Sequence, residues 1–250
     1  MNCSKRYTLE ICAGSWDSVV AARDGGADRI ELCTALSEGG LTPSIGLITA
    51  ACCLEGISVH VLIRPRGGDF LYTDDEAALI EADICHAIAA GANGVVVGSL
   101  TQDGNINESQ LHRWVTAAAG HSVTFHRAFD LCQNPEHALE TIIACGCNRL
   151  LTSGQADKAT NGLQLLTCLV RQAADRISIM PGCGVNAINA AEILRKTGAC
   201  EIHASARRPL GSHMQYRRDN VSMGQPCDEY VRLETHADEV RAIRHSIDTI

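Results

Sequence analysis

A short pattern occurs four times along the chain and limits the folds open to it. Each copy is a glycine, one small residue and then the start of an apolar run, at 26–30, 91–95, 146–150 and 198–202. The copies are spaced 65, 55 and 52 residues apart. A glycine that ends a helix in the left-handed conformation, with a strand directly after it, produces this pattern. The repeat therefore predicts a recurring helix–strand unit.

Further apolar segments of strand length lie between these copies, at 58–63, 122–126 and 177–180, and 8–12 precedes the first copy. Segments with helical periodicity separate the strands, at 16–23, 74–90, 108–119, 135–144, 163–174 and 187–196. Eight such units predict an α/β fold, a (β/α)8 TIM barrel. A doubly wound sheet is the alternative. Because Cys12-Ala-Gly-Ser15 follows the first strand in place of G-x-G-x-x-G, no nucleotide cofactor is indicated.

The length of 250 residues suits one domain, 1–250. We expect the barrel to occupy about 8–208, with a polar C-terminal extension over about 209–250 that ends in a charged helix-like stretch and packs on the barrel. The composition is 46% hydrophobic but only 4% aromatic, which favours helices on a buried parallel sheet over an antiparallel sandwich.

Charge and hydropathy exclude several partners. A formal net charge of -8 argues against nucleic acid, which requires a basic face. No apolar run approaches the roughly 18 residues of a membrane span, and the N-terminal residues do not resemble a secretory signal, so we expect a cytoplasmic protein. The 13 cysteines have no C-x2-C spacing, and we interpret most of them as reduced, buried packing residues.

The first two predicted strands both end in Glu-x-Cys, at Glu10-Ile-Cys12 and Glu31-Leu-Cys33. Side chains alternate along a strand, so within each pair the carboxylate and the thiol share a face. If the glutamates point into the barrel, two thiols lie on neighbouring strands and offer the soft ligands that select Cu(I). The alternative is that Cys12 and Cys33 are small packing residues at the barrel rim.

Charged and glycine-bearing segments also follow other predicted strands, where barrel enzymes carry their sites. The residues that we expect to bind an anionic substrate are Arg64, Arg66, Asp69, Arg127, Ser153, Gly182, Gly184, His203 and Arg207. The arginines make a basic mouth on an acidic protein, and the glycine turns present backbone N–H groups. The alternative is internal pairing of these arginines with the acidic residues Glu10, Glu31, Asp69 and Asp130.

Acid–base chemistry needs groups that hold or move a proton at these strand ends. The candidates are Glu10, Glu31, His126 and Asp130, with an arginine to stabilise developing negative charge. A structural role for His126 is the alternative. No strand-end lysine offers Schiff-base chemistry, and no H-E-x-x-H, G-x-S-x-G or Walker sequence occurs.

Several longer motifs together resemble one known family, the CutC family. They are 28–33 with 37–44, 63–72, 123–130, 151–154, and, in the C-terminal segment, 214–217 and 221–223. The resemblance runs from about Leu9 into the C-terminal helix, in order. It implies a cytoplasmic TIM barrel, a homodimer or higher homo-oligomer, with a role in copper homeostasis. Residue by residue, Cys12 and Cys33 match the thiols proposed as Cu(I) ligands in animal members.

Two functions therefore stay open, beside a third possibility that the charged strand ends are mainly structural and the protein serves as an interaction platform. The first is a Cu(I)-binding homeostasis protein with Cys12 and Cys33 as ligands. The second is an enzyme acting on a small phosphorylated or carboxylated metabolite, because the strand-end glutamate, arginine, histidine and aspartate look like an enzyme pocket. One departure from the family is Cys183, where glycine or alanine is usual, and a third thiol there either extends a metal site or obstructs phosphate.

Overall fold

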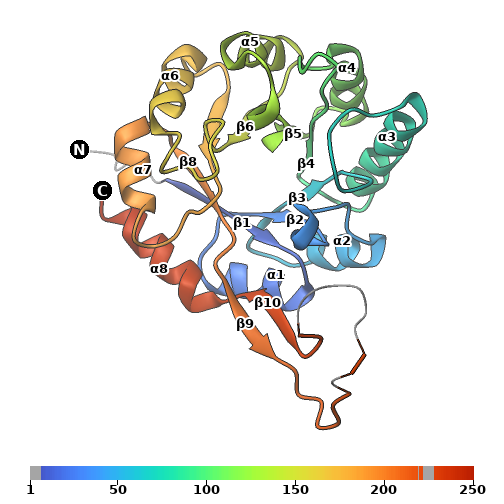
Figure 1. Ribbon diagram of the computed structural model, residues 1–250, viewed down its shortest axis with the longest axis vertical. Helices are drawn as coiled ribbons and strands as arrows, with labels where there is room; N and C mark the ends of the chain where they lie inside the picture. Colours follow the sequence, from blue (N-terminus) through green and yellow to red (C-terminus); the bar gives the residue numbers. More distant parts are fainter. Residues whose placement is uncertain (1–6, 219, 222–227) are drawn as a thin grey trace.

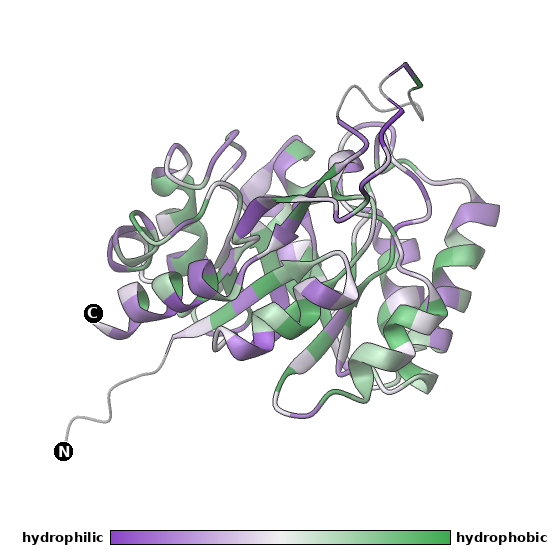
Figure 2. Ribbon diagram, turned by 90° about the horizontal axis from the view of Figure 1, so that it is seen from below, coloured by the Kyte–Doolittle hydropathy of each residue, from purple (hydrophilic) through white to green (hydrophobic). Residues whose placement is uncertain are grey.

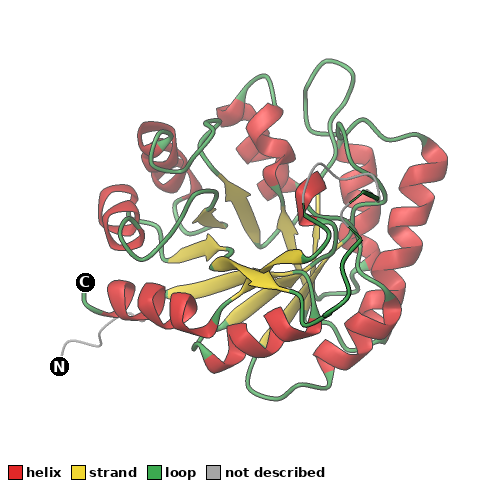
Figure 3. Cartoon of the chain, turned by 60° about the horizontal axis from the view of Figure 1, so that its bottom comes forward, coloured by secondary structure: helices red, strands yellow, loops and turns green. Residues whose placement is uncertain are grey.

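The protein is a (β/α)8 barrel, as the repeat predicts. A computed structural model describes residues 7–218, 220–221 and 228–250. Eight parallel strands follow the order β7-β6-β5-β4-β3-β2-β1-β8, and β8 lies beside β7 (Figure 1). The helices form a ring outside the strands (Figure 3). This arrangement places the carboxyl ends of all eight strands at one mouth of the barrel.

The elements lie close to their predicted positions. The barrel strands are β1 (Thr8–Ala13), β2 (Arg29–Leu32), β3 (Ser58–Leu62), β4 (Gly94–Val97), β5 (Ser122–Phe125), β6 (Arg149–Thr152), β7 (Ser178–Pro181) and β8 (Glu201–Ala204). The helices are α1 (Trp16–Asp24), α2 (Ile45–Cys52), α3 (Asp74–Ala89), α4 (Glu108–Ala117), α5 (Pro135–Ala144), α6 (Leu163–Ala173), α7 (Ala190–Thr197) and α8 (Ala237–Asp248). Short 3-10 turns, η1 (Leu36–Glu38) and η2 (Arg127–Leu131), follow β2 and β5.

Local sequence explains where the helices begin and end. The four glycines of the repeat, at 26, 91, 146 and 198, all have positive φ angles, between 76° and 101°. Only glycine adopts this conformation cheaply, and it turns the chain from each helix toward the next strand. At the opposite end, Thr73 and Glu76 form a capping box that satisfies the first free N–H groups of α3.

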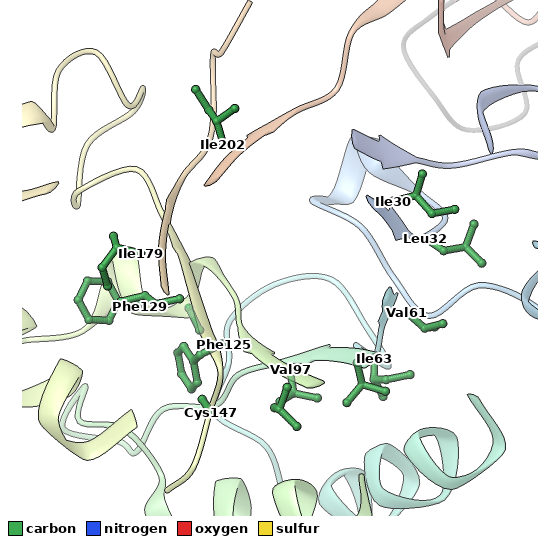
Figure 4. Close-up of a cluster of buried hydrophobic side chains, with 14 of the residues drawn as sticks. Ile30, Leu32, Val61, Ile63, Val97, Phe125, Phe129, Cys147, Ile179 and Ile202 are labelled. Atoms are coloured by element: carbon green, nitrogen blue, oxygen red, sulfur yellow. The ribbon is translucent and has the colours of Figure 1, made fainter. Parts of the chain in front are cut away.

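The apolar core lies between the strands and the helices. Side chains that point from the strands toward the helices fill this layer. Among them are Ile30, Leu32 and Val61, and Ile63 directly after β3 (Figure 4). In the hydropathy-coloured view the strands carry apolar segments while the helices show polar bands (Figure 2). Trp114 of α4 is fully buried and donates its ring N–H to the carbonyl of Ala77, which fixes α4 against α3.

The C-terminal segment divides into two parts. β9 (Arg207–Gly211) and β10 (Val231–Thr235) form an antiparallel ribbon that extends from the barrel mouth (Figure 1). α8 then packs on α1 and α7 and completes the ring of helices. The C-terminal helical stretch thus packs on the barrel as expected. It is not an addition to the barrel, however, but its eighth helix. Residues 222–223 of the C-terminal motif lie outside the described residues.

The barrel interior below the mouth holds a network of charges. Arg29 contacts the carboxylates of Glu10 and Glu201, and Arg149 pairs with Glu201 at 2.5 Å. His60 lies in the same layer, and burial lowers its pKa to about 3. Buried charges need such partners, so this network forms a rigid polar floor beneath the mouth.

Within the described ranges, no helix combines the length and the apolar content needed to cross a membrane.

Candidate functional site

A cavity of about 270 Å³ opens at the carboxyl ends of the strands. Polar and charged residues from six strand ends line it: Cys12, Glu31, Arg64, His126, Arg127, Cys183, His203, Ser205 and Arg207. Apolar residues complete the wall: Leu36, Leu62, Phe70, Leu151, Val185 and Ala204. The cavity occupies the place where barrel enzymes bind their ligands.

Three side chains of types that can ligate a metal converge in the cavity. One ligand atom each from Cys12, Glu31 and His203 lie within 4.8 Å of one another. The strand register explains the convergence, since Cys12 of β1 pairs directly with Glu31 of β2, and β8 flanks β1 on its other side. A thiol, a carboxylate and an imidazole at this spacing form a set able to hold a metal ion.

Glu10 fixes the orientation of His203 from below. His203 Nδ1 lies 2.8 Å from Glu10 Oε1, and Arg29 contacts the other carboxylate oxygen. Despite full burial, Arg29 and His203 lower the pKa of Glu10 well below its ordinary value. Hydrogen bonds to Cys12 and Glu10 in turn raise the pKa of His203, against the effect of burial. Glu10 therefore does not line the cavity but supports the histidine that does.

The Cys12 thiol is activated by its neighbours. A hydrogen bond from Cys33 and the nearby His203 lower its pKa to about 5. Cys33 is fully buried, and the same hydrogen bond with burial raises its pKa well above the ordinary value. The structure thus brings the two predicted thiols into contact, with Cys12 at the cavity and Cys33 behind it.

Glu31 is a buried carboxyl group. It is 6% exposed, and burial raises its pKa to about 8. Its Oε2 has no hydrogen-bond partner. Glu31 is therefore largely protonated at neutral pH and able to donate a proton into the cavity.

Arg64, Phe70 and His126 form a second group on the cavity wall. The Arg64 guanidinium donates to the carbonyls of Glu38, Gly40 and Gly68 and lies over the Phe70 ring, 4.9 Å from its centroid. The same ring lies 4.9 Å from the His126 imidazole. Burial and the charge of Arg64 lower the pKa of His126 to about 3, so this ring is neutral at pH 7.

Four of the predicted anion ligands do not line the cavity, and two of these, Arg66 and Asp69, pair with each other. Arg66 pairs with Glu76 at 2.5 Å and with Asp69 at 3.2 Å, and it lies over the Tyr72 ring. This is the internal pairing that the sequence left as the alternative. The reason is local, because the 65–72 loop turns after Arg64 and directs Arg66 toward the start of α3.

Asp130 has a structural role in the loop after β5. It pairs with Arg127 at 2.7 Å and accepts hydrogen bonds from Thr152, from the backbone and hydroxyl of Ser153, and from the backbone of Gln155. These contacts occupy the carboxylate. Asp130 and Ser153 do not line the cavity, whereas Arg127 does.

Two residues of the turn after β7 belong to the cavity wall. Cys183 and Gly184 line the cavity, and both have positive φ, 76° and 71°. Gly182 lies against Leu151 and His203 instead, where an added Cβ would come within 2.5 Å of the leucine side chain. The Cys183 thiol donates to the Asp157 carbonyl at 3.0 Å.

Three residues that contribute to the cavity or to the charged floor beneath it were not identified from the sequence. Phe70 directly follows Asp69 of the charged loop, and Ser205 lies directly after a strand, so position alone gave a weak signal. Arg29 opens β2 two residues before Glu31, and strand alternation places it on the same inner face. That alternation was the available signal for the charged floor.

The fold and site define a (β/α)8 barrel with a cysteine–histidine–carboxyl cluster in a basic, half-apolar mouth. Residues 7–208 match the model of the CutC family. The chain belongs to the CutC family, as its motifs predict.

Relatives and solved structures agree with this assignment. A protein of Chromobacterium violaceum named family protein CutC is 48% identical over 243 residues, covering 96% of this chain and 98% of the relative. One of the same name from Bacteroides thetaiotaomicron is 50% identical over 239 residues, covering 94% and 96%. The crystal structure of the putative copper homeostasis protein CutC from Streptococcus agalactiae has a TM-score of 0.75 at 33% identity, covering 79% of this chain and 97% of that one.

More distant barrels share the fold alone. N-(5'-phosphoribosyl)anthranilate isomerase from Pyrococcus furiosus has a TM-score of 0.57 at 13% identity, covering 98% of this chain and all of that one.

Proposed function

We propose that this protein binds Cu(I) in copper homeostasis, with Cys12, Cys33 and His203 as ligands. The observation that carries the proposal is the position of the Cys12 thiol, which contacts both the Cys33 thiol and the His203 imidazole, while Glu10 holds Nδ1 of that imidazole. Thiolate and imidazole are donors suited to Cu(I). In metal sites, the ring nitrogen of a ligating histidine that does not bind the metal usually donates a hydrogen bond to a carboxylate or carbonyl group.

Glu31 completes the surroundings of this site without serving as a main ligand. Its carboxyl is a hard oxygen donor, which Cu(I) disfavours, and its raised pKa keeps it neutral. The relative from Streptococcus agalactiae carries copper homeostasis in its name, which supports the same function here.

An anaerobic Cu(I) competition titration against a chelator tests the proposal. The reduced protein is expected to bind one Cu(I) tightly, and Cys12→Ser/Cys33→Ser to lose that binding while remaining folded. Cys52→Ser/Cys53→Ser is the matched control, because this thiol pair ends α2 and lies outside the cavity. Equal affinity in all three proteins contradicts the proposal.

An enzyme acting on a small anionic metabolite is the second candidate function. The cavity favours it, because about 270 Å³ with apolar walls exceeds what one metal ion requires. Glu31, with its raised pKa, is the proton donor of this candidate. A metabolite screen that reveals turnover lost in Glu31→Gln supports the enzyme, and a screen without any stabilising metabolite counts against it.

We also propose a cytoplasmic location and a homo-oligomeric state. The described cysteines are free thiols, which suits a reducing compartment. Size-exclusion chromatography with light scattering measures the oligomeric state directly.

A further inference from the structure

Arg64 is a buried cation without a counter-charge. It is 5% exposed, and within the described ranges no carboxylate forms an ion pair with it. Three backbone carbonyls accept from its terminal nitrogens, yet its Nε has no partner. Carbonyl dipoles position the guanidinium, but they do not neutralise its charge, and a buried charge is costly until an opposite one meets it.

His126 offers a second unused donor beside it. Its Nδ1 accepts the backbone N–H of Ala128 at 3.1 Å, so the neutral ring carries its proton on Nε2. Nε2 is buried and has no partner. The Phe70 ring contacts both the guanidinium and the imidazole, which places the two donors in one group.

The charges around the cavity do not compensate Arg64. Arg207, which also lines the cavity, has no ion-pair partner in the part of the chain that the structure describes. Arg127 is paired with Asp130, and His203 with Glu10. Glu31 is the acidic residue that lines the cavity, and among the described residues no ion pair joins it to Arg64 or Arg207.

We propose that Arg64 and His126, with Arg207 of the same cavity, form an oxyanion-binding subsite that holds the carboxylate or phosphate group of a small molecule. The guanidinium supplies charge and a planar set of donors, and His126 supplies a neutral N–H. The apolar wall of Phe70, Leu36 and Leu62 accommodates the rest of the molecule. This inference deepens the second candidate function and rests on it for the identity of the ligand, but it does not require copper.

Direct anion binding tests the subsite. Inorganic phosphate and malonate are titrated separately into the copper-free full chain at constant ionic strength, followed by calorimetry and thermal unfolding. Saturable binding of at least one of them is expected. Phosphate alone identifies a phosphorylated ligand and malonate alone a carboxylated one, whereas binding of neither overturns the proposal.

Three variants locate the binding. Arg64→Gln removes the charge, and His126→Asn retains an acceptor for the Ala128 N–H while removing the Nε2 donor. Each is expected to weaken the anion's affinity about tenfold or more. Arg66→Gln is the matched control, two residues away in the same loop but outside the cavity, and is expected to bind as the wild type does. Equal weakening in the control overturns the proposal.

Two further measurements keep the outcomes separate. If Arg64→Gln does not fold, His126→Asn and Arg207→Gln carry the test, and unchanged binding in both contradicts the subsite. A Cu(I) titration of His126→Asn is expected to match the wild type. If His126→Asn loses anion binding but keeps copper binding, the result concerns the subsite alone. If the wild type binds no Cu(I), the result concerns the proposed copper function alone.

Discussion

The Nδ1 atom of His203 lies 2.8 Å from a carboxylate oxygen of Glu10, a fully buried residue of the neighbouring strand. The contact holds the imidazole with its other nitrogen available at the cavity, close to Cys12 and Glu31. Arg29 holds Glu10 in turn. The charged floor of the barrel therefore prepares the geometry of the site at its mouth.

Removing the carboxylate that orients His203 is expected to weaken copper binding without touching a ligand. Glu10→Gln should lower Cu(I) affinity about 10- to 100-fold, the usual effect of losing such a support. Competition titration of the folded variant measures it. Glu76→Gln, which breaks only the half-exposed pair with Arg66, should leave the affinity unchanged. Equal affinity in Glu10→Gln and the wild type would show that the support is not needed.

Copper binding is expected to release protons. His203 and Cys33 have raised pKa values and are protonated at pH 7, whereas Cys12, with a pKa of about 5, is already a thiolate. Ligation by all three should release about two protons per copper near neutral pH, and affinity should fall as pH is lowered. Calorimetry in buffers of different ionisation enthalpy counts the protons, and a count near zero would argue against His203 and Cys33 as ligands.

Acid is expected to act on the protein through His60 and His126. Burial lowers both pKa values from 6.5 to about 3, so the unfolded chain binds these protons first as pH falls. The free energy of unfolding therefore does not depend on these histidines above about pH 6.5. Between about pH 6.5 and 3 it falls by up to about 1.4 kcal/mol per pH unit for each histidine. Urea unfolding of His126→Asn at pH 7 and pH 5 should show a smaller difference than the wild type. An identical difference would contradict the assignment.

Cys183 is expected to cost stability. Its φ of 76° lies in the left-handed region, which a residue with a Cβ occupies at about 1 kcal/mol. Cys183→Gly should raise the free energy of unfolding by up to about 1 kcal/mol, since glycine removes this strain. Cu(I) affinity should stay the same, because Cys183 is not among the proposed ligands. Chemical denaturation and competition titration check the two effects, and weaker copper binding would make Cys183 part of the metal site.

The sequence was sufficient for the fold because each repeat carries its own local signals. The glycines at 26, 91, 146 and 198 end helices through conformations that depend only on the neighbouring backbone. The C-terminal segment lacked such signals. The pairing of β9 with β10 joins residues 20 to 28 positions apart, so the ribbon became visible only in three dimensions.

The site was less predictable because it depends on register and on loop direction. The sequence placed Cys12 and Cys33 at equivalent strand ends, but the stagger of tilted strands pairs Cys12 with Glu31. His203 meets Glu10 only because β8 lies beside β1. Arg64 and Arg66 are two residues apart and look alike in sequence. The turn of the chain places Arg64 in the cavity and Arg66 in an ion pair with Glu76 outside it.

X-ray absorption spectroscopy of the Cu(I)-loaded protein tests the central claim most directly, because it reports the ligand atoms themselves. The proposed set of Cys12, Cys33 and His203 predicts two sulfur neighbours and one nitrogen neighbour, with the nitrogen lost and the sulfurs kept in His203→Gln. A spectrum that His203→Gln leaves unchanged, or copper retained with the same ligands in Cys12→Ser/Cys33→Ser, would contradict it.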